Sequence, residues 1–106
     1  MANEGRLDNV EKLKGYLARE VPCEIIGDGV RGQRKRTLRL NNLPATATKK
    51  SIIRVIDQFY KDGGWSPVLP PVGQTYDVYE TKGREQVVTT TVGRGFGLVT
   101  VSEESL

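Results

Sequence analysis

The spacing of hydrophobic residues changes along the chain, and each spacing predicts a different element. Between residues 7 and 19, apolar side chains recur every three or four positions, which is typical of an amphipathic helix with one apolar stripe. These positions are Leu7, Val10, Leu13 and Leu17. Pro22 ends this helix, because the residue before a proline is pushed toward extended geometry. The apolar residues of 21–26 then predict a short strand.

The middle of the chain predicts a second strand and a second helix. Glycines at 27 and 29 are turn residues, and a basic loop follows as far as residue 35. Residues 37–43 alternate between apolar and polar side chains, as in a half-buried strand. Thr48 is a suitable N-cap for a helix whose apolar residues share one face. Gly63 and Gly64 end this helix.

The last third of the chain is rich in strand signals. The stretch WSPVLPPVG, residues 65–73, is interrupted by prolines, which favours an irregular connection or an edge segment. Residues 76–80 and 86–92 are strand-like and surround a Lys-Gly turn, which indicates a hairpin. Residues 96–101 form the last predicted strand. This order predicts an α+β sandwich with helices on one face of an antiparallel sheet.

Length and composition indicate one domain spanning residues 1–106, with a frayed N-terminus at 1–5. No apolar run approaches the roughly 18 residues that span a bilayer, so we expect no membrane partner. The first residues are too charged for a secretory signal, which predicts a cytoplasmic chain.

The chain lacks the residues on which most catalytic sites depend. It contains no histidine and a single cysteine, Cys23, which excludes Ser–His and Cys–His pairs and the familiar zinc sites. Residues 27–32 match G-x-G-x-x-G, but a strand is predicted after them, where a dinucleotide site needs a helix N-terminus. We therefore expect a protein that is not an enzyme and holds no metal and no small-molecule cofactor.

Positive charge gathers in one stretch of the sequence. Five cations fall within nine residues: Arg31, Arg34, Lys35, Arg36 and Arg39. A block of this kind favours polyanionic partners, although a solvated basic loop is the alternative explanation.

Two short segments resemble the paired motifs of the RNA recognition motif (RRM). Residues 94–101, RGFGLVTV, resemble the octapeptide called RNP1. Arg94, Gly95, Phe96, Gly97 and Val99 match, whereas Leu98 and Val101 stand in place of aromatic residues. Residues 38–43, LRLNNL, resemble the partner hexapeptide RNP2. Here Leu38, Leu40, Asn42 and Leu43 match, and Arg39 stands in place of the aromatic residue. The resemblance covers about residues 36–103.

The resemblance implies a fold. It predicts a two-layer, ferredoxin-like sandwich with a four-stranded antiparallel sheet and two helices on one face. The family runs β-α-β-β-α-β, yet only residues 102–106 follow the octapeptide here. A spare helix and strand lie instead at residues 6–26. We therefore expect a circularly permuted order, α-β-β-α-β-β.

The resemblance also implies a single-stranded nucleic-acid partner, with RNA favoured over DNA. Phe96 would stack on a base and Arg94 would hold a phosphate. Arg39 would make a second stacking or ionic contact, and Asn42 is part of the same predicted surface. The basic block would add a positive lip, namely Arg31, Arg34, Lys35 and Arg36.

Other interpretations remain open. Phe96 can instead pack under a loop, in which case its glycines only curve the sheet. The loss of two of the three usual aromatics also fits a protein-interaction or homodimerisation module that uses the same sheet face. Trp65 is expected to cover the helix–sheet core, and Glu103 and Glu104 are expected to be solvated.

Overall fold

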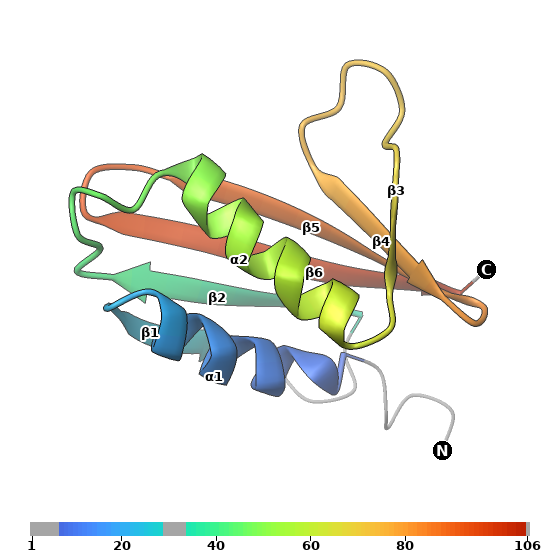
Figure 1. Ribbon diagram of the computed structural model, residues 1–106, viewed down its shortest axis with the longest axis horizontal. Coiled ribbons are helices and arrows are strands. Elements are labelled where there is room, and N and C mark those ends of the chain that lie inside the picture. Colours follow the sequence, from blue (N-terminus) through green and yellow to red (C-terminus); the bar gives the residue numbers. More distant parts are fainter. Residues whose placement is uncertain (1–6, 29–33, 106) are drawn as a thin grey trace.

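The computed structural model describes residues 7–28 and 34–105, which form two layers. A six-stranded antiparallel sheet makes one layer, and two helices lie together on one of its faces (Figure 1). The elements are α1 (Asn9–Glu20), β1 (Glu24–Asp28), β2 (Lys35–Asn41), α2 (Lys49–Asp62), β3 (Ser66–Val68), β4 (Asp77–Thr81), β5 (Arg84–Val92) and β6 (Phe96–Ser105). The strands are ordered β1-β2-β6-β5-β4-β3 across the sheet.

The predicted α+β class is confirmed, but the predicted four-stranded sheet is wrong. Strands β3 and β4 extend the sheet beyond β5 and bring it to six strands. Strand β3 was not predicted because it contains Pro67, and proline has no N–H to donate to a neighbouring strand. Proline is tolerated here because β3 is an edge strand, which pairs on one side only. The strand-like pattern of β4 was visible in the sequence, but it had no place in the four-stranded plan that the resemblance implied.

Both helices form where the sequence predicted them. The apolar stripe of α1 is buried against the sheet through Val10, Leu13 and Leu17. Helix α2 begins with a reciprocal capping box, in which Thr48 Oγ1 accepts from the Ser51 N–H and Ser51 Oγ accepts from the Thr48 N–H. The chain leaves α2 through Gly64, whose φ of 89° lies in the left-handed region that favours glycine.

The core lies between the helices and the face of the sheet that they cover, called here the covered face. Leu38 and Leu40 of β2 and Val99 and Val101 of β6 are fully buried there. The aromatic rings of Tyr60 and Tyr79 stack with their centroids 4.2 Å apart. Trp65 closes this cluster edge-on at 5.4 Å from the Tyr60 ring, which confirms the expectation that it covers the core.

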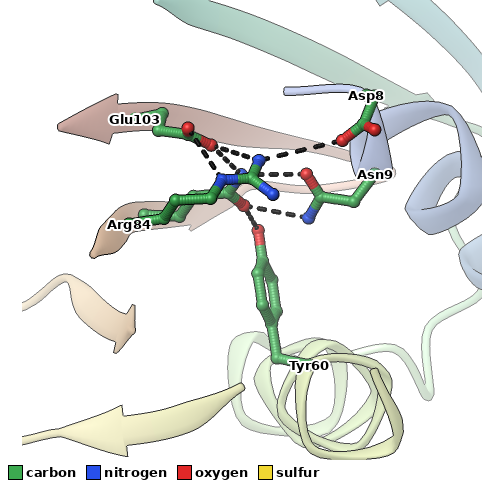
Figure 2. A network of polar contacts seen from close by, with 6 residues as sticks. Asp8, Asn9, Tyr60, Arg84 and Glu103 are labelled. Atoms are coloured by element: carbon green, nitrogen blue, oxygen red, sulfur yellow. Dashed lines mark hydrogen bonds and ion pairs between the residues drawn. The ribbon is translucent and has the colours of Figure 1, made fainter. Parts of the chain in front are cut away.

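A polar network crosses the covered face beneath the start of α1 (Figure 2). Arg84 donates two hydrogen bonds to the Glu103 carboxylate, at 3.0 and 2.7 Å. Gln86, fully buried, donates to Glu103 at 2.7 Å and exchanges two hydrogen bonds with Asn9 of α1. The Tyr60 hydroxyl of α2 donates to Gln86 as well. Both helices are therefore joined to β5 and β6 by polar contacts as well as by apolar packing.

The expectation that Glu103 is solvated is wrong, whereas its neighbour Glu104 is exposed. Successive side chains of a strand point to opposite faces, so the two carboxylates lie on opposite sides of β6. Burial raises the pKa of Glu103, but hydrogen bonds from Arg84 and Gln86 outweigh that effect and hold its pKa below the ordinary value.

Candidate nucleic-acid interface

The face of the sheet opposite the helices, called here the open face, carries the predicted binding residues on its central strands. On β2 it presents Lys35, Thr37, Arg39 and Asn41. On β6 it presents Phe96, Leu98, Thr100 and Ser102. Among residues 7–28 and 34–105, both helices lie on the other side of the sheet (Figure 1). This region is therefore the place at which a flat ligand can reach the strands.

Strands β2 and β6 bring the two RRM-like segments together. They are hydrogen-bonded neighbours in the sheet, and their register places Arg39 beside Leu98 and Asn41 beside Phe96. These segments are separated by more than fifty residues in the sequence, so their adjacency is a result of the fold. The resemblance required this adjacency, and the structure provides it.

Phe96 lies on the open face with 38% of its surface exposed, so it does not pack into the core. Its ring lies over Gly93: a Cβ atom added at Gly93 would come within 2.5 Å of the Phe96 ring. The backbone between them forms a tight turn, closed by a hydrogen bond from the Gly93 N–H to the Phe96 carbonyl. Gly95 adopts a φ of 75° in this turn. The glycines thus make room for the ring and shape the turn that presents it.

Arg39 completes a shared surface with Phe96. Its guanidinium carbon is 5.8 Å from the centre of the Phe96 ring, within the range of a cation–π contact. Its Nε donates to Asn41 Oδ1 at 3.0 Å, which fixes the guanidinium beside the ring. A phenyl ring and a guanidinium are both flat groups on which a base can stack. We call Phe96 and Arg39 the platform.

Arg94 and Asn42 lie at the edge of the platform. Both side chains are exposed, Arg94 in the turn before β6 and Asn42 just after β2. Asn42 has a φ of 58°, a left-handed conformation that asparagine tolerates better than most residues. A hydrogen bond from the Leu43 N–H to the Gly95 carbonyl ties the end of β2 to this turn. Between the two segments is a hollow of about 400 Å³, lined in part by Leu43 and Arg94.

The predicted basic lip is divided by the structure. Lys35 is exposed on the open face, opposite Ser102, and Arg34 is exposed just before it. Arg36 points to the covered face, where it is 8% exposed and its Nη2 lies 2.8 Å from Glu11 Oε1. The structure therefore does not bring Arg36 to the interface. Arg31 lies outside the described residues.

Acidic and basic side chains occupy different strands of the open face. At the end away from Phe96, Glu80 pairs with Glu85, and Glu85 pairs with Glu104, so three carboxylates share one row. Like charges directly opposite each other repel. Negative charge also reaches the platform end through Glu24 of β1, which pairs with Asn41. The cations of the open face, Lys35 and Arg39, lie on β2 between these acidic residues of β1 and of β4 to β6.

Sequence reasoning missed several residues of the open face. Ile26 of the edge strand β1 pairs with Arg39 and is 49% exposed. Leu98 pairs with Arg39 on the other side, so an apolar residue lies beside Arg39 on each neighbouring strand. Thr37 and Thr100 share a hydrogen bond of 3.2 Å between their hydroxyls. The signal that locates them is strand pairing, which alternation within a single strand does not reveal.

Within the part of the chain that the structure describes, no group of three or more Cys, Asp or Glu side chains is arranged to hold a metal ion. Neither α1 nor α2, the two described helices, is long and apolar enough to cross a bilayer. Comparisons of the chain with models of protein families, with curated proteins and with solved structures find no match.

Proposed function

We propose that this protein binds single-stranded nucleic acid, RNA in preference to DNA, on the open face of its sheet and without catalysis. The observation that carries the proposal is the platform, an exposed phenyl ring and a hydrogen-bonded guanidinium side by side on an uncovered sheet face. The resemblance of β2 and β6 to the two RRM motifs supports the same function. The lone cysteine, which cannot form a disulfide within the chain, is consistent with the cytoplasmic location that we propose.

The physical argument depends on stacking. Unpaired bases have two flat apolar faces, and each base stacked on an aromatic side chain contributes about 1–3 kcal/mol. A duplex hides these faces, so the platform discriminates against paired strands. With one aromatic ring and one guanidinium, the platform holds about two bases, so we expect weak binding to short sites.

The second contribution to binding is electrostatic. Arg94 is exposed in the turn before β6, beside the platform, and Arg34 and Lys35 are exposed at the opposite end of β2, where Lys35 pairs with Ser102. All three can neutralise backbone phosphates of a strand that runs along the face. Each phosphate neutralised on a single strand releases counterions and adds roughly 0.7 to the slope of log affinity against log salt concentration. The glutamate row on β4, β5 and β6 repels phosphates from these strands at the end away from Phe96. Binding is therefore expected to be local and strongly salt-dependent.

Salt-titrated affinity for an unstructured RNA oligonucleotide separates these two contributions. Phe96→Ala removes stacking but no charge, so we expect affinity to fall by about 5- to 100-fold with an unchanged salt slope. Arg34→Ala combined with Lys35→Ala should lower the slope by roughly 1. Lys50→Ala with Arg54→Ala, on the exposed side of α2, removes the same charge away from the site and is the matched control.

Other outcomes of these titrations would contradict the proposal. A wild-type protein that fails to bind RNA or DNA at low salt contradicts the proposal. Equal losses from the Arg34/Lys35 and Lys50/Arg54 variants would show that only net charge matters for the electrostatic contribution, and an unchanged affinity of Phe96→Ala would show that the platform has no role. Repeating the titration with DNA of the same base sequence measures the preference for RNA.

One observation favours a second function, a protein-interaction or homodimerisation module on the same face. Ile26, Leu98 and Phe96 form an apolar strip beside Arg39, and Ile26 is half exposed on an edge strand. A protein partner that covers this strip would remove apolar surface from water. Under this function, Ile26→Ser abolishes association, and oligonucleotides do not bind.

A further inference from the structure

We propose that the proline-rich loop between β3 and β4 binds an aromatic groove between α1 and α2 on a second copy of this chain. The loop comprises residues 69–76. The groove is lined by the rings of Tyr16, Phe59 and Trp65 and, around them, by Asn9, Lys12, Asp62 and Gly63. This contact lies away from the platform, and it holds whether or not the open face binds nucleic acid.

The loop carries the most exposed apolar side chains of the described residues. Leu69 is 93% exposed, and Val72 is fully exposed. Pro70 and Pro71 lie between them, and a hydrogen bond from the Gln74 N–H to the Pro71 carbonyl closes a turn in which Gly73 has a φ of 88°. The prolines and the turn restrict the backbone before any partner arrives, so little conformational entropy remains to be lost on binding.

The surroundings of the loop favour a protein partner over a membrane. From Gly63 to Tyr76 the sequence contains no charged residue, and the acids Asp62 and Asp77 flank this stretch. A loop that binds a lipid surface is usually flanked by lysine or arginine, which are attracted to anionic headgroups. Here the flanking carboxylates would be repelled instead.

The groove has the chemistry that such a loop requires. Proline-rich segments, whose backbone is already restricted, bind in grooves lined by aromatic rings. Several aromatic rings lie close together here. The ring centroids of Tyr16 and Phe59 are 5.7 Å apart, and the Trp65 ring contacts the Tyr60 ring just before β3. The groove has a volume of about 380 Å³, near the lower end of the range for binding pockets. One loop with two apolar side chains is a suitable occupant.

The loop is held away from the groove of its own chain. Val68 pairs with Val78 at the base of the loop, so the loop continues outward from the β3–β4 hairpin. In Figure 1 it projects beyond the rest of the molecule, on the side away from the C-terminal end of α2. Leu69 is four residues beyond Trp65, about 13 Å along an extended strand. A second copy can present its loop from outside, and reciprocal exchange of two loops closes a two-fold dimer.

The direct test is a cross-linking experiment between two different single-cysteine chains. In a Cys23→Ala background, one chain carries Val72→Cys and the other carries Lys12→Cys. We expect a short thiol cross-linker to join the mixed chains into a heterodimer, because loop and groove come from different copies. A chain with Lys50→Cys, exposed at the start of α2, replaces the Lys12→Cys chain as a control and should give no cross-link.

Sedimentation of the unmodified protein provides the second readout. Leu69→Ser combined with Val72→Ser should raise the dissociation constant of the dimer by about 10- to 100-fold. Gln74→Ala with Thr75→Ala, in the same exposed loop, should change it less than about twofold. The inference is overturned by a protein that stays monomeric up to roughly millimolar concentration, or by a dimer that the serine variant leaves unchanged. A dimer broken by Ile26→Ser alone would assign the interface to the open face.

Discussion

Glu103 and Glu104 are neighbours on β6, yet they point to opposite faces of the sheet. Glu103 points to the covered face, where Arg84 and Gln86 saturate its carboxylate with hydrogen bonds. Glu104 points to the open face, where the residue that pairs with it is another glutamate, Glu85. The covered face thus gives the Glu103 carboxylate partners within the chain. The open face leaves the Phe96 ring exposed and places Glu85 opposite Glu104. Neither feature stabilises the fold, so we interpret this face as a surface for a partner.

The largest expected effect on stability comes from removing the charge of Glu103 on the covered face. Glu103→Gln removes the charge that pairs with Arg84 in a mostly buried position, and we expect the free energy of unfolding to fall by about 2 kcal/mol. Glu104→Gln is the matched control on the open face, and it should change stability by less than about 0.5 kcal/mol, in the stabilising direction if repulsion from Glu85 dominates. Urea unfolding followed by circular dichroism measures both. Equal losses in the two variants would refute the distinction between the faces.

The same comparison predicts a dependence on pH. The pKa of Glu103 is lowered in the folded protein, so its carboxylate contributes stability at pH values above its ordinary pKa of 4.5. This contribution disappears as the pH falls below 4.5 through the lowered folded pKa. We expect the stability difference between the wild type and Glu103→Gln to be constant near neutral pH and to shrink in acid. A stability difference that grows in acid would mean that folding raises the pKa of Glu103 instead of lowering it.

A smaller effect is expected from a glycine on the open face. Gly93→Ala places a Cβ against the Phe96 ring, which is partly exposed and has to move aside, so the loss of stability should be no more than about 1 kcal/mol. Because the ring moves, RNA affinity should fall by about 3- to 10-fold. Gly15→Ala, at an exposed site within α1 with no atom near the new methyl group, should raise stability by about 0.5–1 kcal/mol and leave binding unchanged. Thermal unfolding and RNA titration of both variants test this pair.

Local signals in the sequence located most of the elements but not their assembly. The apolar stripe of α1 and the N-cap at Thr48 depend on residues a few positions apart, and both predictions are confirmed. The sheet depends on pairing between distant strands, and a template with four strands left out β3 and β4. Local patterns therefore predicted individual helices and strands, whereas the number of strands in the sheet could be read only from the structure.

The same limit applies to the candidate site. The exposure of Phe96 and its proximity to Arg39 were expected from two short motifs, and the structure brings these residues together. The orientation of Arg36 was not foreseen, because a run of adjacent cations gives no sign that alternate side chains on a strand face opposite ways. Ile26 was missed for a related reason, since only the pairing of β1 with β2 places it beside Arg39.

The most direct test of the central claim is a map of backbone amide shifts by nuclear magnetic resonance while a short uridine-rich RNA is added at low salt. The account predicts progressive shifts at Arg39, Asn41, Phe96 and Leu98, with α1 and α2 unchanged and with no shifts for the same sequence in a duplex. Shifts confined to the helices, or none at any RNA concentration, would contradict it.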